Sequence, residues 1–203
     1  MRAFVVVTVA VALLVTAGVA MAAPVTVNFG VLGTNTLDIT APNSLNLNGV
    51  TFMYDNFGSV DDFASADATG IYGTTYGGLL FNFDAPATSL DFNFSLLSAP
   101  GPSPDDLVVL LTNAGADVAV LPVATNVFNL YDPNDPSQGG DALGKFSYNG
   151  ARFDQAVLFF ATDAPIFTVD SVKYTPAAVP EPSSIVAALA LLVGVGGTLR
   201  RRR

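Results

Sequence analysis

The sequence contains no cysteine, no histidine and no tryptophan among its 203 residues. Without cysteine the chain has neither disulfide bonds nor thiolate metal sites, and thiol catalysis is excluded. Without histidine it lacks the usual general base near neutral pH, which excludes Ser-His-Asp triads and the usual zinc sites. These absences favour a non-catalytic protein.

Charged residues are also scarce, at 12% of the chain, and basic ones are scarcest in the middle. Between residues 24 and 179 only Lys145, Arg152 and Lys173 are basic, against sixteen aspartates, which gives a net charge of −13. A surface of this sign repels phosphates, so nucleic acid is not an expected partner. The hydrophobic fraction of 51% and the length of this segment fit one ordinary domain with its own core.

The first 23 residues have the pattern of a secretory signal peptide. Arg2 precedes an apolar run from Ala3 to Val19, and small residues follow at 20–23. Cleavage after Ala22 or Ala23 would remove this segment on export. A retained membrane anchor is the alternative, which the shortness of the run disfavours.

Three elements stand in a fixed order at the other end of the chain. A motif with the only glutamate comes first, an uncharged apolar run at 185–199 follows, and four arginines close the sequence; the motif and the basic cluster are Val179, Pro180, Glu181, Pro182, Ser183, Ser184 and Arg200, Arg201, Arg202, Arg203. Counted from Pro182, the uncharged stretch would span about 27 Å as a helix, close to the ~30 Å hydrocarbon core of a membrane. The arginines favour a cytoplasmic C-terminus, with the aspartate-rich body on the far side of the membrane.

This tail, residues 179–203, resembles the PEP-CTERM sorting signal of diderm bacteria, which exosortases process. The resemblance implies that the transmembrane helix at 185–199 holds the chain transiently in the inner membrane. It also implies that an exosortase-like membrane protease cuts near Pro180 to Pro182 and passes the body to the cell surface or extracellular matrix, often alongside exopolysaccharide production. A plain single-span tail anchor is the alternative.

The body at 24–178 shows mainly apolar alternation. Leu90, Phe92, Phe94 and Leu96 alternate with polar residues, as in a half-buried strand. Similar runs, separated by Gly, Pro, Asn and Asp, predict strands at 26–29, 50–57, 79–83, 107–111, 118–121, 145–148, 157–161 and 167–174. No segment keeps a helical period, so we expect almost no helix beyond one turn within 61–68. The pattern predicts an all-β antiparallel sandwich, with a jelly roll as the first choice and an up-and-down barrel as the second.

The last of these strands carries two further signals. Its apolar residues change phase between Phe167 and Val169 on one side and Val172 and Tyr174 on the other, which predicts a bulge near 170–171. The strand also loosely resembles the closing strand of jelly-roll carbohydrate-binding modules, in which an aspartate often holds a structural calcium; Asp170 would take that place. Those modules usually pair it with a glutamate near their first strand, and this body has no glutamate.

Other aspartates gather in the segment 132–141, which holds Asp132, Asn134, Asp135 and Asp141. Calcium prefers roughly six to eight such oxygen ligands, so calcium is a possible cofactor. The spacing is not that of an EF-hand, and a solvated surface loop is the alternative. The adjacent pairs at 61–62 and 105–106 would point to opposite faces of a strand, so we expect them in loops or turns.

Exposed aromatic rings commonly serve as stacking platforms for sugars. Five of the six tyrosines lie in or beside expected loops or strand ends, and they are the candidates for glycan binding: Tyr54, Tyr72, Tyr76, Tyr131 and Tyr148. The fifteen phenylalanines are expected mostly in the core, because the strand pattern buries them.

Together these patterns predict an exported, exosortase-sorted protein of the surface or extracellular matrix, with a structural or adhesive role. The alternative is a calcium-dependent carbohydrate-binding module that holds exopolysaccharide at the cell surface. A polysaccharide-active enzyme is the third choice. Glycoside hydrolysis needs two carboxyl groups roughly 5 to 10 Å apart, and no spacing among the aspartates selects such a pair.

Overall fold

A computed structural model describes residues 22–178, except 102, 134, 136–138 and 161–163. The sorting motif at 179–184, the predicted transmembrane helix at 185–199, the basic cluster at 200–203 and nearly all of the predicted signal peptide lie outside the described residues. Within the described part of the chain, no helix has the length and apolar character that a membrane span requires. Residues Ala23–Ala177, which match the predicted body to within one residue at each end, form one compact unit.

The body is built almost entirely of antiparallel strands, as the sequence predicts. In chain order the described strands are β1 (Val25–Thr26), β2 (Leu37–Asp38), β3 (Leu45–Leu47), β4 (Val50–Asp55), β5 (Ala64–Asp67), β6 (Gly70–Thr74), β7 (Gly78–Ala99), β8 (Leu107–Asn113), β9 (Ala116–Val123), β10 (Val127–Leu130), β11 (Gly140–Phe159) and β12 (Ile166–Pro176). The helical element described is the 3-10 turn η1 (Phe29–Leu32), where the Asn28 side chain accepts a hydrogen bond from the Gly30 N–H.

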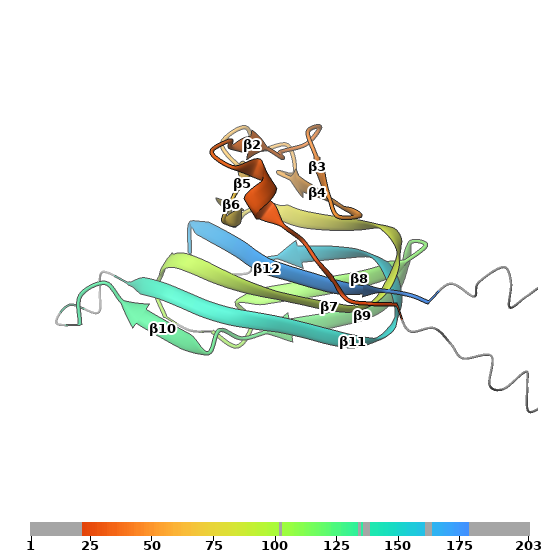
Figure 1. Ribbon diagram of the computed structural model, residues 1–203. Coiled ribbons are helices and arrows are strands. Elements are labelled where there is room, and N and C mark those ends of the chain that lie inside the picture. The colour runs from red at the N-terminus through yellow and green to blue at the C-terminus, as the bar shows by residue number, and fades with distance from the viewer. Residues whose placement is uncertain (1–21, 102, 134, 136–138, 161–163, 179–203) are drawn as a thin grey trace, which may run out of the picture. The chain divides into compact units, whose positions relative to one another are not determined.

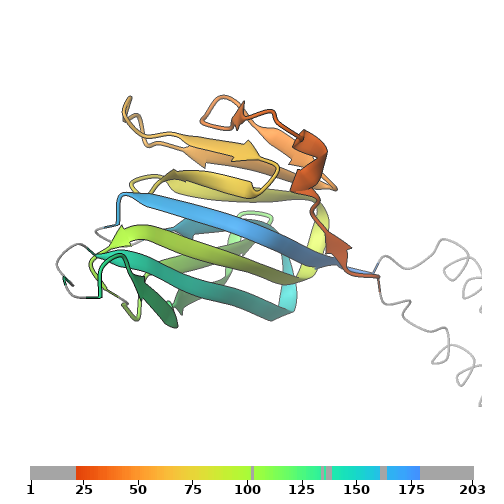
Figure 2. The same ribbon diagram turned by 60° about the vertical axis from the view of Figure 1, so that its left-hand side comes forward.

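Two long strands, β7 and β11, bend and run through both layers of a sandwich (Figures 1 and 2). The second part of β7 pairs with the first part of β11 and with β12, whereas its first part pairs with β4 and with the end of β11. The bend in β11 coincides with register shifts between Asn149 and Gln155. We call the layer with strand order β2-β5-β6-β12-β7-β11-β10 sheet A, and the layer with order β3-β4-β7-β11-β8-β9 sheet B.

The core lies between the inner faces of the two sheets. On β7 the side chains of Leu90, Phe92, Phe94 and Leu96 are buried, which confirms the predicted alternation. Ring contacts connect the layers: Phe81 on the sheet B part of β7 lies 5.9 Å from Phe92 on its sheet A part, measured between ring centroids. Because the core is complete within the body, the body is expected to fold without the two ends of the chain.

The bends explain one difference from the sequence-based expectation. The sequence predicts separate strands at 79–83 and 90–96, and again at 145–148 and 157–161, but each pair is part of one strand, β7 or β11. The polar and small residues that interrupt the apolar pattern mark corners where an extended chain crosses from one sheet to the other. They are not loops in which a strand ends.

A second difference concerns the helical turn expected within 61–68, which is wrong. Residues Ala64–Asp67 are strand β5, in which Ala64 and Ala66 are buried and Ser65 and Asp67 face outward. The small side chains of β5 pack closely against β6. A Cβ at residue 73 on β6 would lie 2.7 Å from the Ala64 Cβ, so glycine is needed there. The predicted strand at 26–29 is also shorter, because Phe29 begins η1.

Strand β12 carries the predicted bulge. Its register to β7 shifts between Asp170 and Lys173, and Ser171 has a φ of 55° in the left-handed region. The extra residue returns the second half of the strand to the same phase as the first, so that Phe167, Val169, Val172 and Tyr174 are all buried. The bulge therefore keeps one face of β12 apolar and leaves Asp170 and Lys173 on the outer face of sheet A.

Candidate functional site

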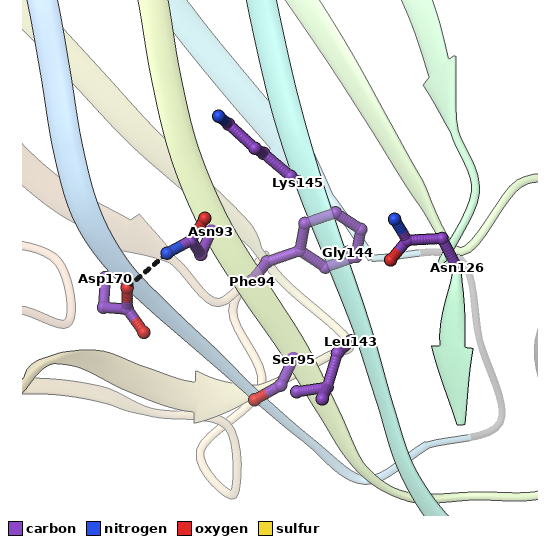
Figure 3. A pocket seen from close by; sticks show the side chains of 8 residues that line it. All are labelled: Asn93, Phe94, Ser95, Asn126, Leu143, Gly144, Lys145 and Asp170. Carbon is purple, nitrogen blue, oxygen red and sulfur yellow. Dashed lines mark hydrogen bonds between the residues drawn. The ribbon is translucent and has the colours of Figure 1, made fainter. Parts of the chain in front are cut away.

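The outer face of sheet A contains an open hollow of about 350 Å³ over β7, β11 and β12 (Figure 3). The residues that line it are Asn93, Phe94, Ser95, Asn126, Leu143, Gly144, Lys145 and Asp170. Cross-strand pairing places Asp170, Asn93 and Lys145 on one rung of the sheet. The next rung holds Thr168, Ser95 and Leu143, so polar groups from three strands converge on one patch.

Hydrogen bonds fix part of this patch and leave other groups available. The Asn93 Nδ2 donates to Asp170 Oδ1 at 3.0 Å, and the hydroxyl oxygens of Ser95 and Thr168 lie 2.6 Å apart. The Asn126 backbone N–H donates to the Leu143 carbonyl at 2.9 Å and holds the segment before β10 against β11. The patch thus offers amide, carboxylate, hydroxyl and ammonium groups, which include both donors and acceptors.

A glycine is needed below the hollow. Gly144 pairs with Phe94 across β7 and β11, and a Cβ at residue 144 would collide with the Phe94 ring. With glycine there, the ring lies against β11, as Figure 3 shows beside the Gly144 label. Glycine at position 144 therefore lets the buried Phe94 ring pack against β11 beneath the hollow.

Three of the five candidate tyrosines are accessible. Tyr72 lies on β6 on the outer face of sheet A, opposite Thr168 and so one strand from the hollow. Tyr76 is 69% exposed in the turn before β7. Tyr131 is 51% exposed, and its hydroxyl donates to Asp141 Oδ1 at 2.6 Å and accepts from the Ser98 N–H at 3.0 Å.

The other two tyrosines correct the sequence-based prediction. Tyr54 is fully buried, its hydroxyl donates to the Thr74 carbonyl at 2.8 Å, and burial raises its pKa. The ring of Tyr148 packs edge-on against Phe153 at 5.6 Å, on the core side of β11. The Tyr54 ring is therefore not a stacking platform, and the alternation of β11 turns the partly buried Tyr148 ring toward the core.

The candidate calcium ligands lie in two places. Asp170 belongs to the hollow, whereas Asp132, Asp135 and Asp141 lie two strands away at the start of β11 and in the segment before it. Asn134 is outside the described residues. Among the residues that are described, no three carboxylates group so as to hold a metal ion. Calcium binding by the segment 132–141 stays a prediction.

The adjacent aspartate pairs lie outside strands, as predicted, but Asp106 has a role that the sequence did not reveal. Its side chain is only 1% exposed. The Oδ2 atom accepts from the Ser103 N–H at 2.9 Å, from the Thr125 N–H at 3.3 Å and from the Thr125 hydroxyl. Asp106 thereby fastens the segment before β8 to the segment before β10, which is a structural role.

Neither a protein-family model nor a curated protein matches this sequence. The structure is similar to family 29 carbohydrate-binding modules. One, from Piromyces equi, is 8% identical over 79% of this chain and 94% of that module, with a TM-score of 0.40. Two mutant modules of the same family are each 12% identical over 70% of this chain. The match covers 90% of the first mutant module with a TM-score of 0.38, and 91% of the second, which is complexed with mannohexaose, with a TM-score of 0.36. A likeness with scores below 0.5 says nothing of what this chain binds.

Proposed function

We propose that the body is a non-catalytic module that binds polysaccharide on the outer face of sheet A. The observation that carries this proposal is the open hollow in which Asn93, Asp170 and Lys145 share a rung. Sugar hydroxyls both donate and accept hydrogen bonds, and the patch offers both kinds of partner. Tyr72, one strand away, supplies an aromatic ring on which a sugar can stack.

The charge of the body favours an uncharged polysaccharide. Residues 24–179 carry a net charge of −13, and Asp91 and Asp170 lie on the outer face of sheet A itself. A polyanion would be repelled by this field, whereas a neutral chain pays no such cost. An open face also suits a long chain that continues past both ends of the site.

Export and sorting complete the proposed role. The signal peptide at 1–23 and the tail at 179–203 support delivery to the cell surface or extracellular matrix through an exosortase-like protease. A test is the intact mass of the protein from the outer surface of producing cells, with a Glu181→Ala variant for comparison. The proposal expects a mass that begins near Ala23 and ends near Pro180–Pro182, and loss of this product in the variant. A mass that includes Arg203 would contradict it.

Binding is tested by retention of the body in gels that contain galactomannan, glucomannan, xyloglucan or the acidic polymer alginate. Retention is expected with a neutral polymer, and Asn93→Ala should weaken it about tenfold, because one or two hydrogen bonds are worth about 1.4 kcal/mol together. Asp61→Asn, a change in an exposed loop, is the control and should leave retention unchanged. Absence of retention on every polymer, or equal retention of Asn93→Ala, would overturn the proposal.

A further inference from the structure

The outer face of sheet B presents an aromatic ring on a strained backbone. Phe57, just after β4, is 63% exposed and has a φ of 51°, a left-handed conformation that bulky residues rarely adopt. The turn holds it there: Asp55 Oδ1 accepts from the Phe57 N–H at 2.9 Å, and Asn56 Oδ1 accepts from the Gly58 N–H at 3.1 Å. Strained backbone conformations cluster at binding sites, and here one carries a large, mostly exposed apolar ring.

A second ring extends this surface. Phe159 at the end of β11 is stacked with Phe57 at an interplanar angle of 18° and a centroid distance of 6.4 Å. Gly78 of β7 lies below both, since a Cβ at residue 78 would lie 3.3 Å from Phe159 and 3.4 Å from Phe57. The two rings therefore lie close against the sheet.

Beside the rings an apolar row crosses sheet B. Strand pairing aligns one residue from each of five strands: Met53, Leu80, Val157, Leu110 and Val120. At ~4.8 Å between strands the row is about 19 Å long. Val120 at its far end is 60% exposed. Such a continuous apolar row on an outer sheet face indicates an interaction surface.

A polar row runs parallel to the apolar one and is displaced from it by two residues along each strand. It joins Thr51, Asn82, Gln155 and Thr112 by strand pairing. The Gln155 Nε2 donates to Asn82 Oδ1 at 2.7 Å, which orients both amides, and an open hollow of about 390 Å³ lies over them. Apolar and amide rows thus lie side by side over the same strands.

We infer that this surface is a second polysaccharide-binding face, an inference that rests on the function proposed above. A sugar chain laid across the strands would place its C–H groups over the rings and the apolar row and its hydroxyls against the amide row. A second copy of the protein fits less well, because two bodies that each carry −13 repel one another.

The two faces give the body two binding directions. Both sheets bury their inner faces in the common core, so their outer faces point to opposite sides of the sandwich (Figure 1). A body with a polysaccharide on each side would join two chains, and linked sites hold a polymer far more tightly than single ones. The protein would then act as a cross-link in a polysaccharide matrix.

The test measures binding and cross-linking for the body and three variants. Gel retention reports binding, and light scattering of the polymer solution reports cross-linking. The polymer is galactomannan or another neutral polymer that retains the wild type. Phe57→Asn removes the ring and leaves a residue that tolerates left-handed φ; Asn93→Ala alters sheet A; the third variant carries both changes. The wild type is expected to raise the light scattering of the polymer solution, because it cross-links the chains. We expect each single change to weaken retention about tenfold and to abolish this rise in scattering. The double change should abolish retention as well. Melting curves check that each variant is folded.

Other outcomes separate the two proposals. If Asn93→Ala alone removes all retention, or Phe57→Asn changes neither measurement, polysaccharide binds on sheet A only and the second face is refuted. If the free wild type sediments as a dimer that Phe57→Asn dissociates, the face joins copies of the protein, and the inference fails. If the wild type is retained by no polymer, the proposed function itself fails.

Discussion

Gly144 shows how one absent side chain makes room for an aromatic ring in the core. Gly144→Ala is expected to destabilise the body by about 1 to 3 kcal/mol, because the new methyl group overlaps the Phe94 ring in a packed core. For a domain of this size that is a fall in Tm of about 2 to 4 °C per kcal/mol, measured by calorimetry. Gly101→Ala is the matched control, since nothing lies within 4 Å of a Cβ at residue 101. Equal Tm values for the two variants would contradict the packing described.

Asp105 and Asp106 form a natural pair for a second prediction. Asp106→Ala leaves two backbone N–H groups and the Thr125 hydroxyl without their acceptor, which should cost about 1 to 3 kcal/mol or more. Asp105→Ala changes an exposed residue and should leave stability within about 0.5 kcal/mol. Urea unfolding of both variants measures the difference. A loss of stability in Asp105→Ala as large as in Asp106→Ala would refute the fastening role.

At the scale of single elements, the strands with large apolar residues were predictable. The alternation along 90–96 predicted burial correctly, and the phase change in β12 predicted its bulge. The same alternation puts Tyr54 in phase with Val50 and Phe52, so its burial could have been read from the sequence. The short strands β2, β3, β5, β6 and β10 were not predicted, because two to five residues are too few to show a clear apolar alternation.

The candidate surfaces were harder to predict than the strands. Asn93, Lys145 and Asp170 are polar residues at outward positions, and any half-buried strand has such residues. What makes them a site is that β11, β7 and β12 are neighbours in this order, which periodicity does not reveal. The exposure of Phe57 could have been predicted. Asp55, Asn56 and Gly58 around it are turn-forming residues, and an aromatic residue within a turn is expected at the surface.

The bulge in β12 provides a prediction for an element. Removing Ser171 should unfold the body or cost several kcal/mol, because it turns half of the apolar residues of β12 away from the core. Ser171→Gly keeps the bulge and relieves the left-handed φ, so it should raise stability by about 0.5 to 1 kcal/mol. Both are measured by thermal melting. A deletion variant as stable as the wild type would show that the bulge does not set the phase of the strand.

For the whole molecule, stability should fall at both ends of the pH range. Hydrogen bonds from Thr40 lower the pKa of Asp38, and those from Thr69 lower the pKa of Asp67. The folded state thus favours the ionised carboxylates, and their contribution is complete above about pH 4 and lost as the pH falls through the folded pKa. Burial raises the pKa of Tyr54 and Tyr174, so their contribution is present below about pH 10 and lost above it.

The measurement is Tm between pH 2 and pH 11 for the wild type, Thr69→Ala and Tyr174→Phe. Thr69→Ala should flatten the acid limb, because Asp67 loses the hydroxyl that favours its ionised form. Tyr174→Phe should flatten the alkaline limb. It also costs the hydrogen bond to the Asn48 carbonyl at all pH values. Limbs as steep as those of the wild type in both variants would show that other groups control the pH dependence.

The pairing of β1 with the end of β12 brings the two ends of the body together. Val25 lies opposite Tyr174 and Thr26 opposite Lys173, so the first and last strands of the body are neighbours. A short linker could join them, and new ends could be opened at the exposed turn of Ala68 and Thr69 between β5 and β6, away from both hollows. The order in which the chain visits its strands is thus separable from the sandwich that they form, and a circular permutant would keep both outer faces.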